Sequence, residues 1–325
     1  MKVTDPGYAT TLTEAAIHAC SLVMKRILTE VEDDPDVALE TLRIGERLKK
    51  ALRIDASAED NLKGAVKQFR NNIFRRIQFY GEESLKETSL DLSKLTRTCA
   101  LMDAVDGTDL VERGLGNWCS DVIFFLPSEQ PGRRIIASVV ALPNGNIYYA
   151  NRDQDGAFVI RNGNRKKPLR LTAISKCRAL KDASICFYGQ KIKNLGVTLQ
   201  TGLLKHFASL EERTGGKDVS ARIYNLAGVP MMMRLIDPVS NAGRGIDAVF
   251  DAVGQQPHDV VPGAYIALKA GAVLKSLVDG PLELPELEAA LMRPASQRLR
   301  YVLAGTEPLC DELIHAVGMR PRLAT

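Results

Sequence analysis

Asp103 and Asp106 stand three positions apart in the run Leu101-Met-Asp-Ala-Val-Asp-Gly-Thr-Asp-Leu110. Carboxylates suit hard divalent cations, and Mg²⁺ usually binds one or two of them together with water and a substrate phosphate. Gly107 and Thr108 add backbone N–H groups and a hydroxyl, which are the donors that a phosphate needs. The run therefore predicts a metal and phosphate site where a strand enters a turn or helix. The same sequence also fits a fragment of a calcium loop or a solvated turn.

Two further acidic segments could join this run in space. The paired acids Glu82 and Glu83 follow the apolar residues Phe79 and Tyr80, and Asp259 precedes an apolar, glycine-containing segment. Carboxylates from distant segments can converge on one cation. The three separated acidic elements therefore favour a metal site over a solvated turn.

The order of these motifs resembles the inositol monophosphatase and fructose-1,6-bisphosphatase superfamily of Mg²⁺-dependent, lithium-sensitive phosphatases. G-E-E-S, D-x-V-D-G-T and D-x-x-x-G follow one another at residues 81–84, 103–108 and 259–263. Shorter matches are Asp55-Ala-Ser-Ala-Glu59, Asp155-Gly-Ala-Phe158 and Gly243-Arg244-Gly245-Ile246-Asp247-Ala248. The resemblance covers the chain from about residue 55 to about residue 275.

The resemblance implies a ligand set and roles for individual residues. Two or three Mg²⁺ ions would be held by Glu82, Asp103, the backbone carbonyl of Val105, Asp106 and Asp259. Residues expected to contact the phosphate or the rest of the substrate are Gly107, Thr108, Asp259, Asn225 and Arg222. Residues expected to support the attacking water are Glu82, Asp106, Thr108 and, behind Thr108, Asp55. Helix capping is a second explanation for Asp55 and Glu59.

The activity that the resemblance implies is hydrolysis of a small phosphate monoester, such as inositol monophosphate or a sugar phosphate, by metal-activated water. Fructose 1,6-bisphosphate or phosphoadenosine phosphate are alternative substrates, because cations such as Arg222 and Arg234 could hold a second phosphate. Each of these cations also fits an ordinary surface position.

Three departures from the family pattern keep a different class of function open. Ala104 replaces the usual proline, His258 replaces a tryptophan, and Asn225-Leu-Ala-Gly-Val-Pro230 stands where the family carries G-S-A-A. A catalytically silent member that binds a ligand or regulates a partner would tolerate such changes. The retained acids favour catalysis, because buried like charges without a cation are unfavourable.

Composition indicates an ordinary protein with room for two subdomains. The chain has 325 residues, 45% of them hydrophobic and 25% charged, with a net charge of +4. We expect an N-terminal α+β subdomain with the metal site at 1–180 and a C-terminal α/β subdomain at 181–325. The mild charge gives no indication of nucleic acid, and the six scattered cysteines predict reduced thiols.

Location and assembly are expectations of the same kind. No apolar stretch approaches the roughly twenty residues of a membrane span, and no signal peptide is recognised, so a cytoplasmic location is expected. The resemblance implies a homodimer.

The order of predicted elements is that of an α+β protein. Helices are expected at 11–32, 36–52, 59–74, 199–214, 229–236 and 263–272, and strands at 122–126, 135–142, 147–150, 169–172, 183–187, 248–252 and 300–304. The resemblance implies that they form the layered αβαβα sandwich of the sugar phosphatases.

Overall fold

The computed structural model describes most of the chain. It covers residues 5, 7–33, 41–44, 49–68, 76–81, 91–162, 164, 167–171, 175–189, 191–215, 218–226, 228–237, 245–278, 282–294 and 297–318. The predicted site residues Glu82 and Glu83 lie outside this part of the chain.

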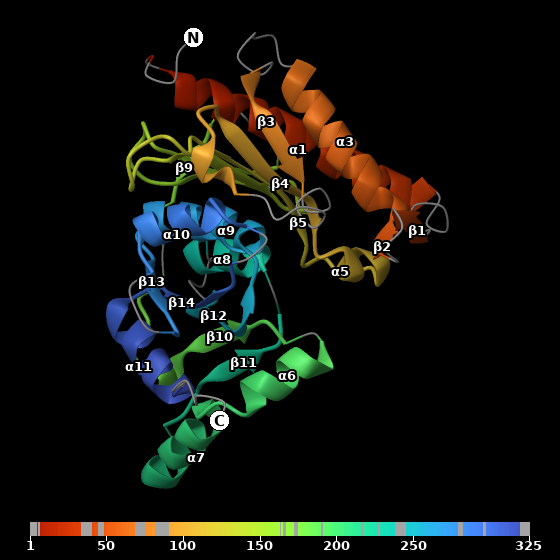
Figure 1. The fold of residues 1–325 in the computed structure, drawn as a ribbon. Coiled ribbons are helices and arrows are strands. Elements are labelled where there is room, and N and C mark those ends of the chain that lie inside the picture. The colour runs from red at the N-terminus through yellow and green to blue at the C-terminus, as the bar shows by residue number, and fades with distance from the viewer. Residues whose placement is uncertain are drawn as a thin grey trace.

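Helices and sheets alternate in layers, in the order helix, sheet, helix, sheet, helix (Figure 1). The first helical layer holds α1 (Tyr8–Asp33) and α3 (Arg53–Gln68). The first sheet has seven strands in sequence order: β3 (Gln78–Gly81), β4 (Cys99–Asp106), β5 (Cys119–Phe125), β6 (Ile135–Ala141), β7 (Ile147–Asn151), β8 (Phe158–Ile160) and β9 (Leu169–Arg170). The middle helices are α8 (Val229–Ile236), α9 (Val261–Lys269) and α10 (Leu284–Leu291).

The second sheet has five strands in the order β11 (Arg222–Tyr224), β10 (Ser184–Phe187), β12 (Ala248–Gln255), β14 (Leu299–Ala304) and β13 (Val273–Ser276). Its outer side carries α6 (Ile192–Leu199), α7 (Leu203–Thr214) and α11 (Glu307–Val317). The remaining elements are the two-stranded sheet of β1 (Thr41–Ile44) and β2 (Lys49–Leu52), the short helix α5 (Thr108–Glu112), and the 3₁₀ turns η2 (Leu92–Lys94), η3 (Leu180–Asp182) and η4 (Pro257–Asp259). The predicted α+β class and layered αβαβα order are confirmed.

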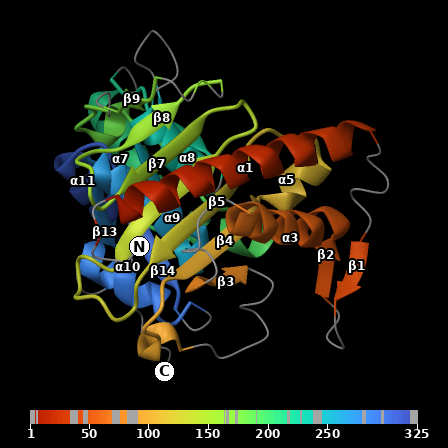
Figure 2. The ribbon, with the colours of Figure 1, turned by 90° about the horizontal axis from the view of Figure 1, so that it is seen from above.

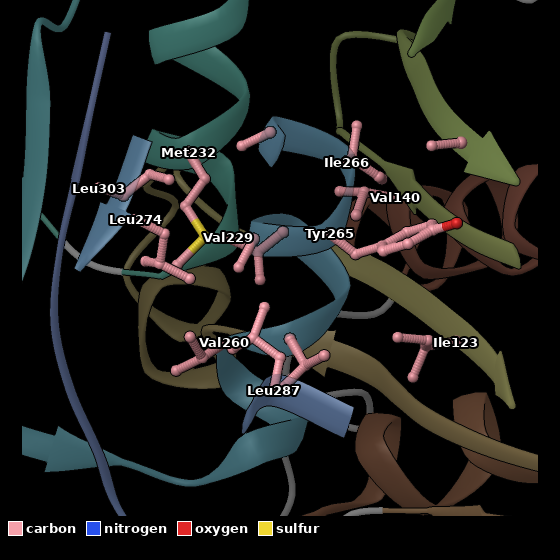
Figure 3. Close-up of a cluster of buried hydrophobic side chains, with 14 of the residues drawn as sticks. Ile123, Val140, Val229, Met232, Val260, Tyr265, Ile266, Leu274, Leu287 and Leu303 are labelled. Carbon is pink, nitrogen blue, oxygen red and sulfur yellow. The ribbon is translucent and has the colours of Figure 1, made fainter. Parts of the chain in front are cut away.

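Three apolar clusters hold the layers together. The first lies between α1, α3 and the seven-stranded sheet, where α1 and α3 run side by side (Figure 2). The second fills the space between the two sheets, with Val229, Tyr265 and Leu287 reaching into it from α8, α9 and α10 (Figure 3). The third lies between the five-stranded sheet and α11. The middle helices are therefore buried on both sides, as their apolar sequences require.

Four strands of the seven-stranded sheet agree with strands predicted from the sequence. The strands predicted at 122–126, 135–142, 147–150 and 169–172 correspond to β5, β6, β7 and β9, and each of these pairs antiparallel with its neighbours. Strands β8 and β9 pair antiparallel, and residues 163, 165 and 166 between them lie outside the described part of the chain. Strand β8 was not predicted, because its three residues are too few to show an alternating pattern.

The helix predicted at 36–52 is wrong. Residues 41–44 and 49–52 form the antiparallel strands β1 and β2, and residues 34–40 and 45–48 lie outside the described part of the chain. Thr41-Leu-Arg-Ile44 alternates polar and apolar residues with a period of two, which favours a strand over a helix. The predicted helix at 59–74 corresponds to α3, which begins earlier, at Arg53.

No described helix is long and apolar enough to cross a membrane. All six cysteines are free, as predicted, and all but Cys177 are buried.

Candidate active site

A β-bulge at the end of β4 places the two carboxylates of the D-x-V-D-G-T motif on one face of the sheet. Asp103 of β4 pairs with Asp121 of β5, and Asp106 of β4 pairs with Cys119 of β5. An advance of three residues along β4 therefore corresponds to only two residues along β5. In a regular strand, residues three apart point to opposite faces. The extra residue restores the parity, and Asp103, Asp106, Cys119 and Asp121 share the face that turns toward the middle helices.

The Asp103 carboxylate also stabilises the bulge itself. Its Oδ1 accepts a hydrogen bond of 3.0 Å from the backbone N–H of Val105, which lies within the irregular segment. A bulge leaves ladder groups without their regular strand partners, so a side-chain acceptor at this place offsets that loss. Asp103 thus fixes the backbone that carries Asp106.

Buried acids and a thiol gather on this face. Asp103 and Asp121 are 5% and 0% exposed, and Cys119 is fully buried. The Cys119 Sγ lies 3.7 Å from Asp106 Oδ2 and 4.0 Å from Asp121 Oδ2. Burial, followed by the charges of Asp106, Asp121 and Asp103, raises the pKa of the Cys119 thiol. The local electrostatic potential is therefore negative and favours binding of a cation.

Gly107 makes the sharp turn from β4 into α5. Its φ of +100° lies in the left-handed region, and a Cβ there would lie 3.1 Å from the Cβ of Trp118. Thr108 then begins α5, and its hydroxyl donates a 3.0 Å hydrogen bond to the carbonyl oxygen of Val105. The Val105 carbonyl is the predicted backbone ligand, and its second lone pair remains suited to a cation.

The third acidic motif reaches the site from the other side. Asp259 ends η4, which packs against β4 and leads into α9. Its side chain accepts a hydrogen bond from the backbone N–H of Gln256. Its Oδ1 lies 3.1 Å from Nε2 of His258, which is 1% exposed. The histidine that replaces the usual tryptophan is therefore a buried residue whose ring lies next to the Asp259 carboxylate.

The start of α8 closes over Asp106. The backbone N–H of Val229 lies 3.4 Å from Asp106 Oδ2. Gly228 has a φ of +79°. A Cβ added at this position would lie 2.9 Å from Asp106 Oδ2, so any larger residue would press against that carboxylate. Glycine at this position lets the middle layer approach the carboxylate closely.

The five-stranded sheet supplies a second wall. Burial raises the pKa of Tyr188 to about 12, and the carboxylates of Asp259 and Asp106 add to this shift. The pKa of Tyr301 is also raised, by burial first and then by Asp251, Asp106 and Asp259. The charges of Asp106 and Asp259 therefore both act on these two tyrosines, which agrees with the packing of η4 against β4.

Asp251 is a further buried acid on this wall. It is 1% exposed, and its Oδ1 accepts hydrogen bonds from the backbone N–H groups of Val253 and Gly254. Burial, only partly offset by these hydrogen bonds, raises its pKa to about 6. A carboxyl with this pKa can exchange a proton near neutral pH.

The remaining predicted residues are spread over three elements. Asp55 lies in the first turn of α3. Glu59, four residues further along the same helix, packs against Gly81. Gly81 ends β3 opposite Met102, and Glu82, the next residue in the sequence, lies outside the described residues. Arg222 is on the edge strand β11, where its guanidinium donates to the carbonyls of Ser220 and Ala221.

Asn225 follows the same edge strand. Its side-chain amide donates a 3.0 Å hydrogen bond to the carbonyl oxygen of Gly189. Among the described contacts, none joins Arg222 or Asn225 to the acidic cluster. Their assignment to the substrate stays a prediction.

Sequence analysis missed Cys119, Asp121 and Asp251. A signal was present: Asp121 and Asp251 each interrupt a strand that is otherwise largely apolar, and Cys119 stands two residues before Asp121. A lone acid in a buried strand calls for a partner. The sequence did not reveal which residues of β5 lie opposite Asp103 and Asp106, since the register between β4 and β5 depends on the bulge.

The donor set fits a divalent cation. Asp103, Asp106 and Asp121 share one face of the sheet, and Asp259 belongs to η4, which packs against β4. Asp106, Cys119 and Asp121 each offer a ligand atom, and these atoms lie within 4.8 Å of one another. Oxygen-rich sites of this kind suit Mg²⁺, whereas a thiol suits softer metals.

Comparisons with known proteins point to one fold. No protein-family model matches the chain, and no curated protein matches it in sequence. Among solved structures, the extragenic suppressor protein suhB of Bartonella henselae has 17% identity and a TM-score of 0.63, over 94% of this chain and 98% of that one. Inositol monophosphatase-II of Staphylococcus aureus has 17% identity and a TM-score of 0.60, over 94% and 91%.

A third similar structure is an IMPase of Thermotoga maritima, with 17% identity and a TM-score of 0.60 over 94% of this chain and 95% of that one. The staphylococcal enzyme has been solved with 2′AMP and with inositol monophosphate bound. The chain therefore has the fold of the inositol monophosphatase superfamily, as its motifs indicated.

Proposed function

We propose that this protein is a Mg²⁺-dependent phosphatase that hydrolyses a small phosphate monoester. The observation that carries the proposal is the bulge in β4, which turns Asp103 and Asp106 to the same side of the sheet and toward Asp259. The family fold supports it.

The chain's own residues would bind, orient and polarise the reactants. Asp103, Asp106, Asp259 and the Val105 carbonyl would hold the metal ions, with Glu82 completing the set. When bound, Mg²⁺ ions would polarise the phosphoryl oxygen and lower the pKa of a coordinated water. Thr108, whose hydroxyl is already oriented by the Val105 carbonyl, would hold the attacking water in line with the ester bond. Gly107 would leave room for the phosphate.

Other parts of the proposal rest on the family resemblance. Asp55 would act on Thr108 from α3, and Asn225 and Arg222 would contact the substrate from the five-stranded sheet. The chain passes from the first sheet to the second between β9 and β10, which suits a division near residue 180. We also propose a homodimer and a cytoplasmic location.

The ligands of the similar structures suggest the first candidate substrates. The structures of the staphylococcal enzyme with inositol monophosphate and with 2′AMP make a cyclitol phosphate and a nucleotide phosphate the first candidates. Fructose 1,6-bisphosphate and phosphoadenosine phosphate remain alternatives.

The test is phosphate release from inositol monophosphate, 2′AMP, fructose 1,6-bisphosphate and phosphoadenosine phosphate, with Mg²⁺ and with EDTA. We expect release from at least one substrate with Mg²⁺ and none with EDTA, and a loss of about 100-fold or more in Asp103→Asn. Asp109→Asn is the matched control, because Asp109 is an exposed acid in the same segment. Release that persists in EDTA, or in Asp103→Asn, would contradict the proposal.

A silent, ligand-binding member of the family is the competing interpretation. Ala104, His258 and Asn225 depart from the family pattern. Such a protein would release no phosphate from any substrate, while inositol monophosphate or 2′AMP would still raise its melting temperature in the presence of Mg²⁺.

A further inference from the structure

A thiol stands inside the acidic cluster, at a place where the family resemblance assigns no ligand. Cys119 belongs to β5, and its Sγ lies 3.7 Å from Asp106 Oδ2 and 4.0 Å from Asp121 Oδ2. Neither Cys119 nor Asp121 is among the residues that the D-x-V-D-G-T, G-E-E-S and D-x-x-x-G motifs supply. Both residues are fully buried, so their contacts are with protein.

Hydrogen bonding of the thiol accounts poorly for this arrangement. A thiol has a single weak donor, and it can serve only one carboxylate at a time. Here two carboxylates lie at similar distances from the same sulfur. Asp103 adds a third on the same face, directly opposite Asp121. Like charges directly opposite each other on paired strands are destabilising.

The separations match those between ligands of one metal ion. With a metal–sulfur distance of about 2.3 Å and metal–oxygen distances of about 2.0–2.2 Å, tetrahedral ligands lie roughly 3.6 Å apart across a sulfur–oxygen edge. The sulfur–oxygen separations of 3.7 and 4.0 Å are close to this value. All three ligand atoms fall within 4.8 Å of one another.

Sulfur selects the kind of ion. Mg²⁺ takes oxygen ligands in octahedral geometry, whereas thiolate ligands favour Zn²⁺ and other borderline or soft cations. Two carboxylates and one thiolate form a set of three protein ligands, which leaves one tetrahedral position for water. Asp106, at the partly exposed end of the cluster, would be shared with the ions of the catalytic cleft.

We propose that Asp106, Cys119 and Asp121 form a mixed oxygen–sulfur position in the metal centre, which binds Zn²⁺ or Co²⁺ in preference to Mg²⁺. The inference builds on the metal centre of the proposed function and adds a thiolate ligand and a further carboxylate to it. A positive ion at this point lies among the buried carboxylates of Asp103 and Asp121 and the partly exposed carboxylate of Asp106, and it offsets their mutual repulsion. The thiol proton is released to solvent as the ion binds.

The test uses Co²⁺, whose bond to a thiolate gives a charge-transfer band in the near ultraviolet. The full chain is stripped with EDTA and titrated with Co²⁺, and absorbance and bound metal are measured together. We expect the band in the wild type and its loss in Cys119→Ser. Asp121→Asn should bind Zn²⁺ at least about 10-fold more weakly, while its Mg²⁺ affinity changes less.

Cys186→Ser is the matched control. Cys186 is also a fully buried thiol of the core between the sheets, on β10, and it has no place in the cluster. This variant should keep the band. Far-ultraviolet circular dichroism checks folding; if Cys119→Ser does not fold, the wild-type band and the Zn²⁺ affinity of Asp121→Asn decide the question.

Three results would overturn the inference: Co²⁺ that binds the wild type without the band, Co²⁺ that does not bind, or a band that survives in folded Cys119→Ser. Each is distinguishable from failure of the proposed function. Mg²⁺-dependent phosphate release without the band removes only the thiolate position. The band without release from any substrate removes the phosphatase and leaves the metal position in place.

Discussion

The two faces of the β4–β5 strand pair differ in composition and in task. The face toward α1 and α3 carries Ala100, Met102, Val122 and Phe124 and is apolar apart from the buried Ser120. The face toward the middle helices is also apolar at first, and then, where the bulge begins, it turns into a line of acids and one thiol. One pair of strands therefore supplies core on one side and chemistry on the other, and substitutions on the two sides should separate stability from activity.

The strongest effect on stability is expected on the apolar face. Phe124→Ala removes a fully buried ring and should lower the free energy of unfolding by about 3–5 kcal/mol. Urea unfolding measures this loss. Because Phe124 points away from the cleft, phosphate release per folded molecule should stay near the wild-type value; a loss of activity as large as that of Asp103→Asn would show that the two faces are not separate.

The opposite sign is expected at the buried acid of the second sheet. The pKa of Asp251 is raised to about 6, so the folded state binds its proton more tightly than the unfolded state does. Its charge therefore costs little below about pH 4, and the cost grows as the pH rises through about 6 and then levels off. Asp251→Asn should be more stable than the wild type at pH 7, by about 2–3 kcal/mol.

Urea unfolding of both proteins at pH 4 and pH 7 measures this difference. The gain in stability should fall to well below its pH 7 value at pH 4, where the folded wild type holds the proton and the unfolded chain is only partly ionised. A constant gain at both pH values would mean that the charge of Asp251 is not its cause.

A smaller effect is expected where α8 meets Asp106. Gly228→Ala forces a side chain into a left-handed conformation, at a cost of about 1–2 kcal/mol, and drives the new Cβ against Asp106 Oδ2. Gly114→Ala is the control, because Gly114 has a φ of +65° and nothing within 4 Å of the added Cβ. Gly228→Ala should lose at least as much stability in urea as Gly114→Ala, and only Gly228→Ala should also lose Mg²⁺-dependent phosphate release.

The difference between the two faces also explains which parts of the fold and of the site could be predicted from the sequence. The antiparallel sheet was predictable from Pro-Gly and Pro-Asn-Gly-Asn turns, and the bounds predicted for α8 agree with the structure. Asp103 and Asp106 were predictable from motif spacing. Their common direction was not, because a period of two would send them to opposite faces. Cys119 and Asp121 enter the site only through the shifted register with β4, which residue spacing does not reveal.

The most direct test of the account is thermal unfolding of the wild type, Asp106→Asn and Asp109→Asn, each with Mg²⁺ and with EDTA. The acidic face predicts that Mg²⁺ raises the melting temperature of the wild type and of Asp109→Asn, and that Asp106→Asn loses this shift. Without metal, Asp106→Asn should melt at the wild-type temperature or above it, because one of several like charges is gone. A Mg²⁺ shift in Asp106→Asn equal to that of the wild type would contradict the claim that this face exists to bind a cation.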